Sequence, residues 1–269
     1  MKYIKKLSTN IFYNVIRIFL VTLLPIIFFL FIMKSRYKLS IINFLKSYIF
    51  LIKKPEYFNV NIKIFSWVIK SWKRKELDYG RGFLYQSYEN FGLYGLRATN
   101  HKMQMINKLL DLGNKKILDI GSNSGFLSVE VAKQAKFVSC VEPNKYLVKQ
   151  GGVLSDFLNQ KNIIFYIKKF EEFKTNEKFG AVLSFANHST YDGETEYTLE
   201  EYFSKISLLL EENGNLVFES HHPYIEKDLS KVKDILLRYF DIKDEMLLES
   251  NNFIDNGRTW LLCQKKLKN

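Results

Sequence analysis

Cysteine is scarce in this sequence of 269 residues, which contains only Cys140 and Cys263. Both cysteines lie in apolar, strand-like runs, which are typical of buried, reduced thiols. Two such residues form no disulfide framework, and they match no cysteine metal spacing. The sequence therefore excludes a small disulfide-stabilised scaffold and favours a reducing compartment.

Acidic residues are nearly absent from residues 1–75, which contain 15 Lys and Arg residues and a single acid, Glu56. This segment therefore has a charge of +14, and because the whole chain has +12, residues 76–269 have −2. The basic excess belongs to the N-terminal segment, where it accompanies an apolar run. This combination favours an anionic membrane surface over nucleic acid as the partner.

Charged residues are missing from residues 18–33, and extending this apolar run back to Ile11 gives 23 residues, including Arg17. About 20 apolar residues span a bilayer. We interpret the run as a single transmembrane anchor or as a monotopic or re-entrant apolar helix. A cleavable signal peptide is the third interpretation, but small residues are lacking after the run, and the first alanine is Ala98. Basic residues after the run predict a cytoplasmic location for the rest of the chain.

Residues 39–75 mix basic side chains with bulky apolar and aromatic ones. This composition predicts helices that lie on a membrane interface. The alternative is a solvated basic linker with helices packed against the following domain. From about Glu76 the composition becomes that of an ordinary globular domain. We therefore expect a transmembrane or membrane-associated basic segment at residues 1–75 and a globular domain at residues 76–269.

Apolar runs and helical periodicities alternate along the globular domain. We expect helices at about residues 101–112, 124–134, 145–158, 198–210 and 229–240. We expect strands at about residues 117–120, 137–141, 163–167, 181–185 and 216–219, and then a hairpin of strands 242–248 and 259–264. The expected fold class is α/β: a doubly wound, mostly parallel seven-stranded sheet with a C-terminal antiparallel hairpin, plus an N-terminal membrane-associated helical segment.

Two glycines of a dinucleotide-binding motif are missing from the turn after the first expected strand. That strand, residues 117–120, leads into Gly121-Ser122-Asn123-Ser124-Gly125, and a helix follows. A strand, a glycine turn and a helix N-terminus together form a ligand cradle. A pyrophosphate site requires Gly-x-Gly-x-x-Gly, whereas Asn123 and Phe126 stand at two of these positions. The cradle therefore favours a ligand with one adenosine and no phosphate.

The segment 118–125 resembles the first motif of class I S-adenosylmethionine-dependent methyltransferases, which is an apolar strand, an acidic residue and Gly-x-x-x-Gly. The next strand ends in Glu142, where this family has an acid that binds both ribose hydroxyls. Residues 208–218 resemble the family's helix, turn and fifth strand, and the terminal hairpin resembles its sixth and seventh strands. The resemblance covers residues 94–265 and implies a methyltransferase with S-adenosyl-L-methionine as its cofactor.

The resemblance also implies which residues bind the cofactor. Phe170 lines the adenine and Glu171 accepts from its amino group, while Arg97 pairs with the methionine carboxylate. Each residue has a plain structural alternative, such as a turn glycine, a carboxylate that holds the turn, an acid at a helix N-terminus or an exposed arginine. The complete set of expected cofactor residues is Asp119, Gly121, Ser122, Asn123, Gly125, Glu142, Phe170, Glu171 and Arg97.

Three of the four histidines, His188, His221 and His222, fall just after the fourth and fifth expected strands. A histidine suits a general base near neutral pH, and an oxygen nucleophile needs such a base. His188 and His221 are the first candidates and His222 is the third; the alternative for each is an ordinary hydrogen-bonding residue. We predict no metal site at Glu219, His221 and His222, because adjacent residues of an extended segment point in opposite directions.

The acceptor is the least constrained part of the prediction. Residues 192–201 are rich in acids, which does not suit a polyanionic substrate. The basic N-terminal segment suits a small-molecule, glycan or lipid-linked acceptor at the membrane. Two alternatives stay open: a tRNA methyltransferase whose basic segment contacts phosphates, and a non-catalytic cofactor-binding scaffold. The sequence does not predict an oligomeric state.

Overall fold

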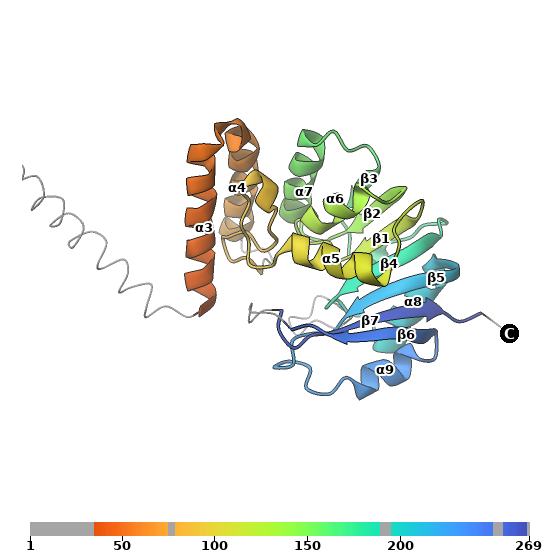
Figure 1. The fold of residues 1–269 in the computed structure, drawn as a ribbon. Helices are drawn as coiled ribbons and strands as arrows, with labels where there is room; N and C mark the ends of the chain where they lie inside the picture. Colours follow the sequence, from red (N-terminus) through yellow and green to blue (C-terminus); the bar gives the residue numbers. More distant parts are fainter. Residues whose placement is uncertain (1–34, 75–78, 189–194, 250–254, 268–269) are drawn as a thin grey trace, which may run out of the picture.

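The computed structural model describes residues 35–74, 79–188, 195–249 and 255–267 (Figure 1). The apolar run at residues 18–33 and the expected domain boundary at residues 75 and 76 lie outside these ranges. Within them, no helix has the length and apolar character needed to cross a membrane. The described residues therefore give no support for a transmembrane anchor.

Seven strands form one sheet in the order β3-β2-β1-β4-β5-β7-β6. The first five strands pair in parallel: β1 (Lys116–Ile120), β2 (Phe137–Val141), β3 (Ile163–Tyr166), β4 (Phe179–Phe185) and β5 (Leu210–Glu219). The last two form the antiparallel hairpin, with β7 also antiparallel to β5: β6 (Phe240–Leu247) and β7 (Thr259–Lys265). This confirms the expected mostly parallel sheet with its closing hairpin.

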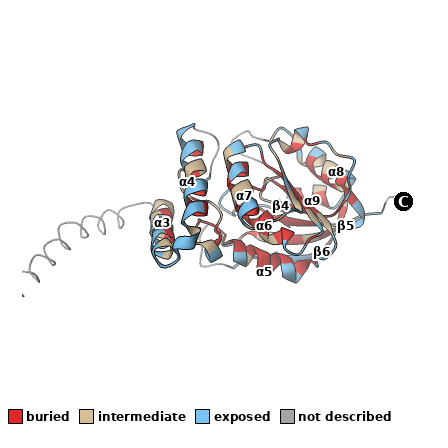
Figure 2. Ribbon diagram, turned by 90° about the horizontal axis from the view of Figure 1, so that it is seen from above, coloured by how far each residue is buried: buried red, intermediate tan, exposed pale blue. Residues whose placement is uncertain are grey.

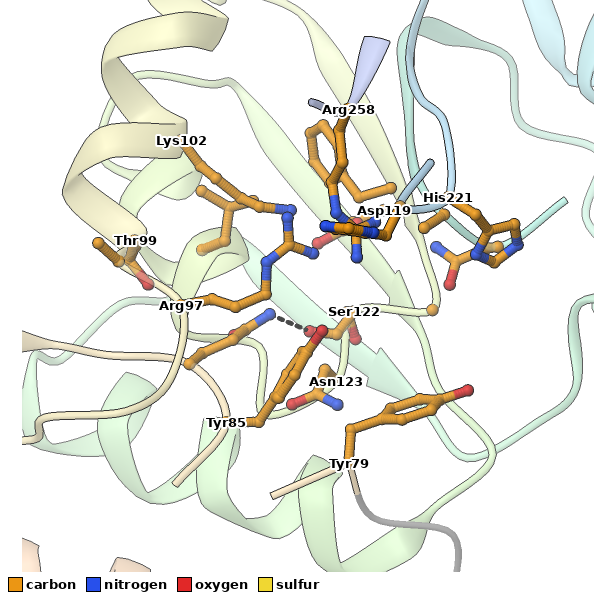
Figure 3. A pocket seen from close by; sticks show the side chains of 18 of the residues that line it. Tyr79, Tyr85, Arg97, Thr99, Lys102, Asp119, Ser122, Asn123, His221 and Arg258 are labelled. Carbon is orange, nitrogen blue, oxygen red and sulfur yellow. Dashed lines mark hydrogen bonds between the residues drawn. The ribbon is translucent and has the colours of Figure 1, made fainter. Parts of the chain in front are cut away.

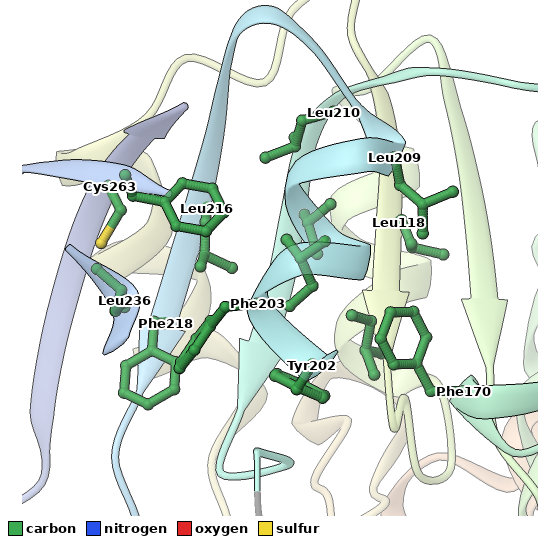
Figure 4. Packing of buried hydrophobic residues seen from close by; sticks show 14 of the residues in the cluster. Leu118, Phe170, Tyr202, Phe203, Leu209, Leu210, Leu216, Phe218, Leu236 and Cys263 are labelled. Carbon is green, nitrogen blue, oxygen red and sulfur yellow. The ribbon is translucent and has the colours of Figure 1, made fainter. Parts of the chain in front are cut away.

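Helices cover both faces of the sheet (Figure 1). One face carries α5 (Thr99–Leu109), α6 (Phe126–Ala132) and α7 (Lys145–Phe157), and the other carries α8 (Leu199–Leu209) and α9 (Ser230–Leu236). Alternate residues of each strand point to opposite faces. Leu118 of β1 accordingly packs with Phe203 of α8 (Figure 4), whereas its neighbour Ile117 packs with Ile106 of α5. Both cysteines are free and buried in these cores.

Two helices precede the domain: α3 (Ser35–Lys53) and α4 (Phe58–Lys73), joined by the short 3-10 helix η2 (Pro55–Tyr57). The inner face of α4 buries Val60, Ile64 and Val68 in a cluster with Leu154 of α7. In both views α4 stands between α3 and α7 (Figures 1 and 2). The inner face of α4 therefore packs against the following domain, as the alternative interpretation of residues 39–75 expected.

The structure corrects three expected boundaries. Helix α6 begins at Phe126, because Gly125 before it has the left-handed φ of 68°, which does not continue a helix. Strand β5 begins at Leu210, where it already pairs with Phe179 across an irregularity in register. Phe240 belongs to β6 and not to the preceding helix. Two further 3-10 helices are η3 (Glu89–Phe91) and η4 (Phe170–Glu172).

The order of the strands reverses between β1 and β4, since the chain passes from β1 to β2 on one side and returns to β4 on the other. Ligands of open parallel sheets bind beyond the carboxyl ends of the strands at this point. The Gly121 turn follows β1 here, and residues 186–188 follow β4.

Candidate functional site

Two adjoining cavities lie at the carboxyl ends of the parallel strands, a larger one of about 400 Å³ and a smaller one of about 160 Å³. They share four lining residues, Tyr79, Gly121, Asn123 and Asn187. The Gly121 turn therefore separates the two cavities, and an elongated ligand can occupy both.

The Gly121 turn is in direct contact with the loop after β4. Gly121 has a φ of +64°, and a Cβ atom there would lie 2.4 Å from the side-chain oxygen of Asn187. The Asn187 amide donates a hydrogen bond to the carbonyl of Ile120. Gly121 itself donates to the carbonyl of Val141 at 2.8 Å. Only glycine fits this position without moving the wall of both cavities.

Gln86 holds the same turn from the other side. Its Nε2 donates to the Ser122 carbonyl at 3.1 Å, and its Oε1 accepts from the backbone N–H of Phe126 at 2.9 Å and from the Ser124 hydroxyl. An amide side chain can do both because it has a donor and an acceptor group. Sequence reasoning missed Gln86, since no motif connects it to a turn 36 residues away.

Gly125 lines neither cavity, and its expected contact with the cofactor stays a prediction. A Cβ atom at Gly125 would lie 2.5 Å from the Phe165 ring of β3. The glycine is therefore required for close packing between the helix start and the sheet.

Glu142 is fixed at the wall of the smaller cavity by two backbone groups. Its Oε2 accepts from the N–H of Asn123 at 3.0 Å, and its Oε1 accepts from the N–H of Asn144 at 2.9 Å. Phe170 and Glu171 line the same cavity, and the Glu171 carboxylate accepts from the N–H of Glu196. The structure thus brings together three of the expected cofactor residues.

Asp119 lies under the turn and lines the larger cavity with Ser122 and Asn123. It is almost fully buried, and its Oδ2 accepts a hydrogen bond of 2.6 Å from the Ser128 hydroxyl. Burial raises the pKa of the Asp119 carboxyl to about 6, although the hydrogen bond from Ser128 opposes this shift.

A buried ionic cluster forms the back of the larger cavity, at the end of β5 (Figure 3). Glu219 is fully buried and lies within 3.0 Å of charged nitrogens of Arg97, Lys102 and Arg258. Burial alone raises the pKa of Glu219, but the three cations lower it well below its ordinary range. The pKa of Lys102 falls to about 8, first through burial and then through the charge of Arg97.

Arg97 lines the larger cavity, but its guanidinium is already bound to two carboxylates. It forms ion pairs with Glu219 and Asp255, and all three groups are buried. These ion pairs tie the segment before α5 to the terminal hairpin, and the expected ion pair between Arg97 and a methionine carboxylate stays a prediction.

The three candidate histidines lie at different depths. His221 and His222 line the larger cavity, whereas His188 is buried and lines neither cavity. The Nε2 of His188 lies 2.8 Å from a carboxylate oxygen of Glu226, and its ring centroid lies 4.6 Å from that of His221. The other oxygen of Glu226 accepts from the backbone N–H of His221 at 3.0 Å. The structure thus places His188 behind His221, and a catalytic role for His188 stays a prediction.

Among the described residues, no group of three or more His, Cys, Asp or Glu side chains comes together as a metal site.

Several residues that line the larger cavity could not be identified from the sequence. Much of the wall of this cavity is formed by aromatic and basic side chains from distant segments, which are Arg36, Tyr79, Tyr85, Lys102, Tyr224 and Arg258. The Tyr-rich composition of residues 79–99 is a signal for Tyr79 and Tyr85 alone.

No protein-family profile matches the chain. A protein of Geobacillus sp. (strain WCH70), provisionally named a methyltransferase, is 30% identical over 112 residues, which cover 42% of this chain and 44% of that protein. Ribosomal RNA small subunit methyltransferase A of Mesomycoplasma hyopneumoniae (strain 232) is 37% identical over 71 residues, or 26% of each chain. The chain thus spans less than half the length of these curated relatives.

Solved structures extend the likeness to most of the described chain. The N-methyltransferase NodS from Bradyrhizobium japonicum WM9, in complex with S-adenosyl-L-homocysteine, matches with a TM-score of 0.55 and 13% identity, covering 74% of this chain and 99% of NodS. A methyltransferase from Pyrococcus furiosus matches with a TM-score of 0.51 and 13% identity, covering 63% of this chain and 83% of its own. The chain therefore has the fold of the S-adenosylmethionine-dependent methyltransferases, as the resemblance in the sequence implies.

Proposed function

We propose that this protein is a methyltransferase with S-adenosyl-L-methionine as its cofactor. The observation that carries the proposal is the Glu142 carboxylate, which two backbone N–H groups orient beside the Gly121 turn. In a domain with this fold, such a carboxylate suits the two hydroxyls of a ribose. The methyltransferase names of both curated relatives and the S-adenosyl-L-homocysteine bound to NodS support the proposal.

The two cavities suggest how the cofactor binds. We assign the adenosine to the smaller cavity, with Phe170 beside the adenine and Glu171 as an acceptor for its amino group. The methionine part then crosses Gly121 into the larger cavity, where Asp119, Ser122 and Asn123 form the wall. The acceptor occupies the remainder of the larger cavity.

When bound, the cofactor supplies a methyl group on a positively charged sulfur for in-line displacement by the acceptor. The residues of the larger cavity have to hold the acceptor and remove its proton. We assign proton removal to His221, because it lines the cavity and Glu226 fixes its backbone. His222 is the second candidate, and His188 is a positioning residue behind His221.

The proposed acceptor is a small-molecule, glycan or lipid-linked compound at the membrane, with the domain on the cytoplasmic side. The basic excess of residues 1–75 supports this choice, and the carboxylates at Glu196, Glu200 and Glu201 oppose a polyanionic substrate. RNA is the second candidate, and one observation favours it: the 37% identity to a ribosomal RNA methyltransferase over 71 residues.

Methyl transfer tests the proposal and separates these acceptors. The purified full chain is given cofactor with a radioactive methyl group, together with lipid, oligosaccharide and RNA fractions. We expect label in the lipid or oligosaccharide fraction and a loss of about 100-fold in rate for His221→Ala. His101→Ala is the matched control, because His101 lines neither cavity.

Two outcomes would contradict parts of this proposal. Transfer to RNA alone, with RNA binding that weakens steeply as salt rises, would replace the acceptor class. Cofactor binding without transfer to any fraction, and without an effect of His221→Ala, would identify a non-catalytic cofactor-binding scaffold.

A further inference from the structure

Helix α3 buries its polar side and exposes its apolar side. Ser40, Asn43 and Ser47 lie on the buried side. The amide of Asn43 donates to the carbonyl of Gly95 at 2.6 Å, and the Ser47 hydroxyl accepts from the N–H of Tyr94 at 3.2 Å. Phe44 and Phe50 add ring contacts with Phe65 of α4 and with Tyr94. The buried side of the helix thus contains three polar side chains, whereas a helix of a water-soluble protein usually attaches through an apolar stripe alone.

The opposite side of α3, which we call the outer face, consists of Leu45, Tyr48, Ile49 and Ile52. These residues follow one another at spacings of three, one and three, so they share one side of the helix. All four are exposed, from 45% for Leu45 to 65% for Ile52. Because α3 stands at the edge of the molecule, beyond α4 from the sheet, the described domain does not cover this face (Figures 1 and 2).

Charge on α3 restricts what can cover the outer face. Helix α3 contains four basic residues and no acid, and Lys38, Lys46 and Lys53 are exposed. A basic helix with an exposed apolar face suits a surface that is both apolar and negatively charged, as the interface of an anionic bilayer is. Lysine stems can lie along the apolar layer while their ammonium groups reach the lipid phosphates.

The neighbouring sequence also favours a lipid bilayer as the partner of this face. The uncharged apolar run of residues 18–33 ends two positions before α3 begins at Ser35. We propose that the outer face of α3 lies in the interface of an anionic phospholipid bilayer. The basic residues then meet lipid phosphates, and the four apolar side chains enter the acyl boundary.

Helix α3 also reaches the larger cavity, from the side opposite the outer face. Arg36, in the first turn of α3, lines that cavity and donates to the carbonyl of Tyr79, another lining residue. It precedes Ser40 and Asn43 by four and seven positions, so it shares their buried side of the helix. Docking of the outer face therefore leaves this cavity wall facing the domain.

A fluorescent label on the full chain tests the docking directly. Ile52→Cys is labelled with an environment-sensitive fluorophore, since Cys140 and Cys263 are fully buried and not accessible to the reagent. The matched control is Leu208→Cys, because Leu208 is 55% exposed on α8. Both labelled proteins are bound to phosphatidylglycerol vesicles that carry nitroxide groups on their acyl chains.

We expect the lipid nitroxides to quench the label at position 52 and aqueous iodide to leave it bright, with the reverse at position 208. Iodide quenching at position 52 equal to that at position 208 would overturn the proposal. A label at position 52 that neither quencher reaches would also overturn it, because the cover would then be residues 1–34 or a second copy of the chain. Cofactor binding measured on the same vesicles reports separately on the proposed function.

A pair of charge-reversal substitutions tests whether the outer face of α3 requires an anionic lipid surface. In the Ile52→Cys background, Lys46→Glu with Lys53→Glu is expected to lower nitroxide quenching several-fold. Lys161→Glu with Lys231→Glu is the matched control at exposed positions outside α3 and is expected to change nothing. The choice of an anionic surface would be overturned by nitroxide quenching that is unchanged in two cases: after the Lys46 and Lys53 reversal, and after phosphatidylglycerol is replaced by phosphatidylcholine.

Discussion

The Asp119 carboxyl group is buried at the base of the larger cavity, with the Ser128 hydroxyl as its hydrogen-bond donor. Its pKa in the folded protein is raised from 3.8 to about 6. A raised carboxyl pKa means that the folded state prefers the protonated form. The ionised form therefore lowers the free energy of unfolding above pH 6, and this cost disappears as the pH falls below about 4.

Asp119→Asn should remove this cost, since the amide oxygen can still accept from Ser128. We expect the variant to be more stable than the wild type at pH 7.5, by up to about 3 kcal/mol, and to differ little at pH 4. Urea unfolding at both pH values measures the difference. A gain of stability that is the same at both pH values would contradict the assigned burial of a charge.

Glu226 is the second residue with a specific expected role, because its two oxygens hold His188 and the backbone of His221. Burial raises the pKa of Glu226, but the hydrogen bond and charge of His188 outweigh it and leave the pKa low. The ionised carboxylate only accepts hydrogen bonds, so it selects the His188 tautomer that is protonated at Nε2.

We expect Glu226→Gln to change the imidazole NMR signals of His188 and His221. The chain has four histidines, so their ring signals are assignable, and His101 serves as the internal control. Glu226→Asp should restore the His188 signal in part. Unchanged signals of both histidines in Glu226→Gln would contradict the positioning role.

At the scale of elements, local patterns predicted most of the fold. The capping box of Thr198 and Glu201 is present at the start of α8, and the hairpin of β6 and β7 closes the sheet. Contacts between distant segments were not predictable in this way. Gln86 and Glu226 meet the site from 36 and 38 residues away, and no periodicity or motif records such a pairing.

The direction of side chains was the other feature that the sequence could not predict. The positions of His188 and His221 after β4 and β5 were predicted, but only the structure distinguishes the buried ring from the one that lines the cavity. The same holds for Gly151, which lies within α7. A Cβ atom there would lie 2.8 Å from the Ser124 carbonyl oxygen, so α7 approaches the Gly121 turn closely.

Helix α4 offers an element-scale prediction, because two isoleucines on it differ in burial. Ile64 is fully buried in the cluster shared with α7, whereas Ile62 is half-exposed. We expect Ile64→Ala to lower the free energy of unfolding by about 2–5 kcal/mol, since it leaves a cavity, and Ile62→Ala to have little effect. Urea unfolding of the full chain compares them; equal losses would show that α4 is not part of the domain core.

At the scale of the whole molecule, three features converge on the carboxyl ends of β1, β2 and β5. The Gly121 turn separates the two cavities, the Glu142 carboxylate lines the smaller one, and His221 lines the larger one. Helix α3 contributes Arg36 to the larger cavity and presents its apolar face outward. The cofactor site and the proposed acceptor site therefore adjoin each other, and α3 connects the larger cavity on one of its sides with the proposed membrane contact on the other.

The most direct test of the central claim is calorimetric titration of the full chain with S-adenosyl-L-methionine. We expect the wild type to bind and Glu142→Ala to bind about 100-fold more weakly, because two charge-assisted hydrogen bonds are lost. Glu177→Ala, at an exposed carboxylate that lines neither cavity, should bind like the wild type. Equal binding by Glu142→Ala and the wild type, or no binding by the wild type, would contradict the account.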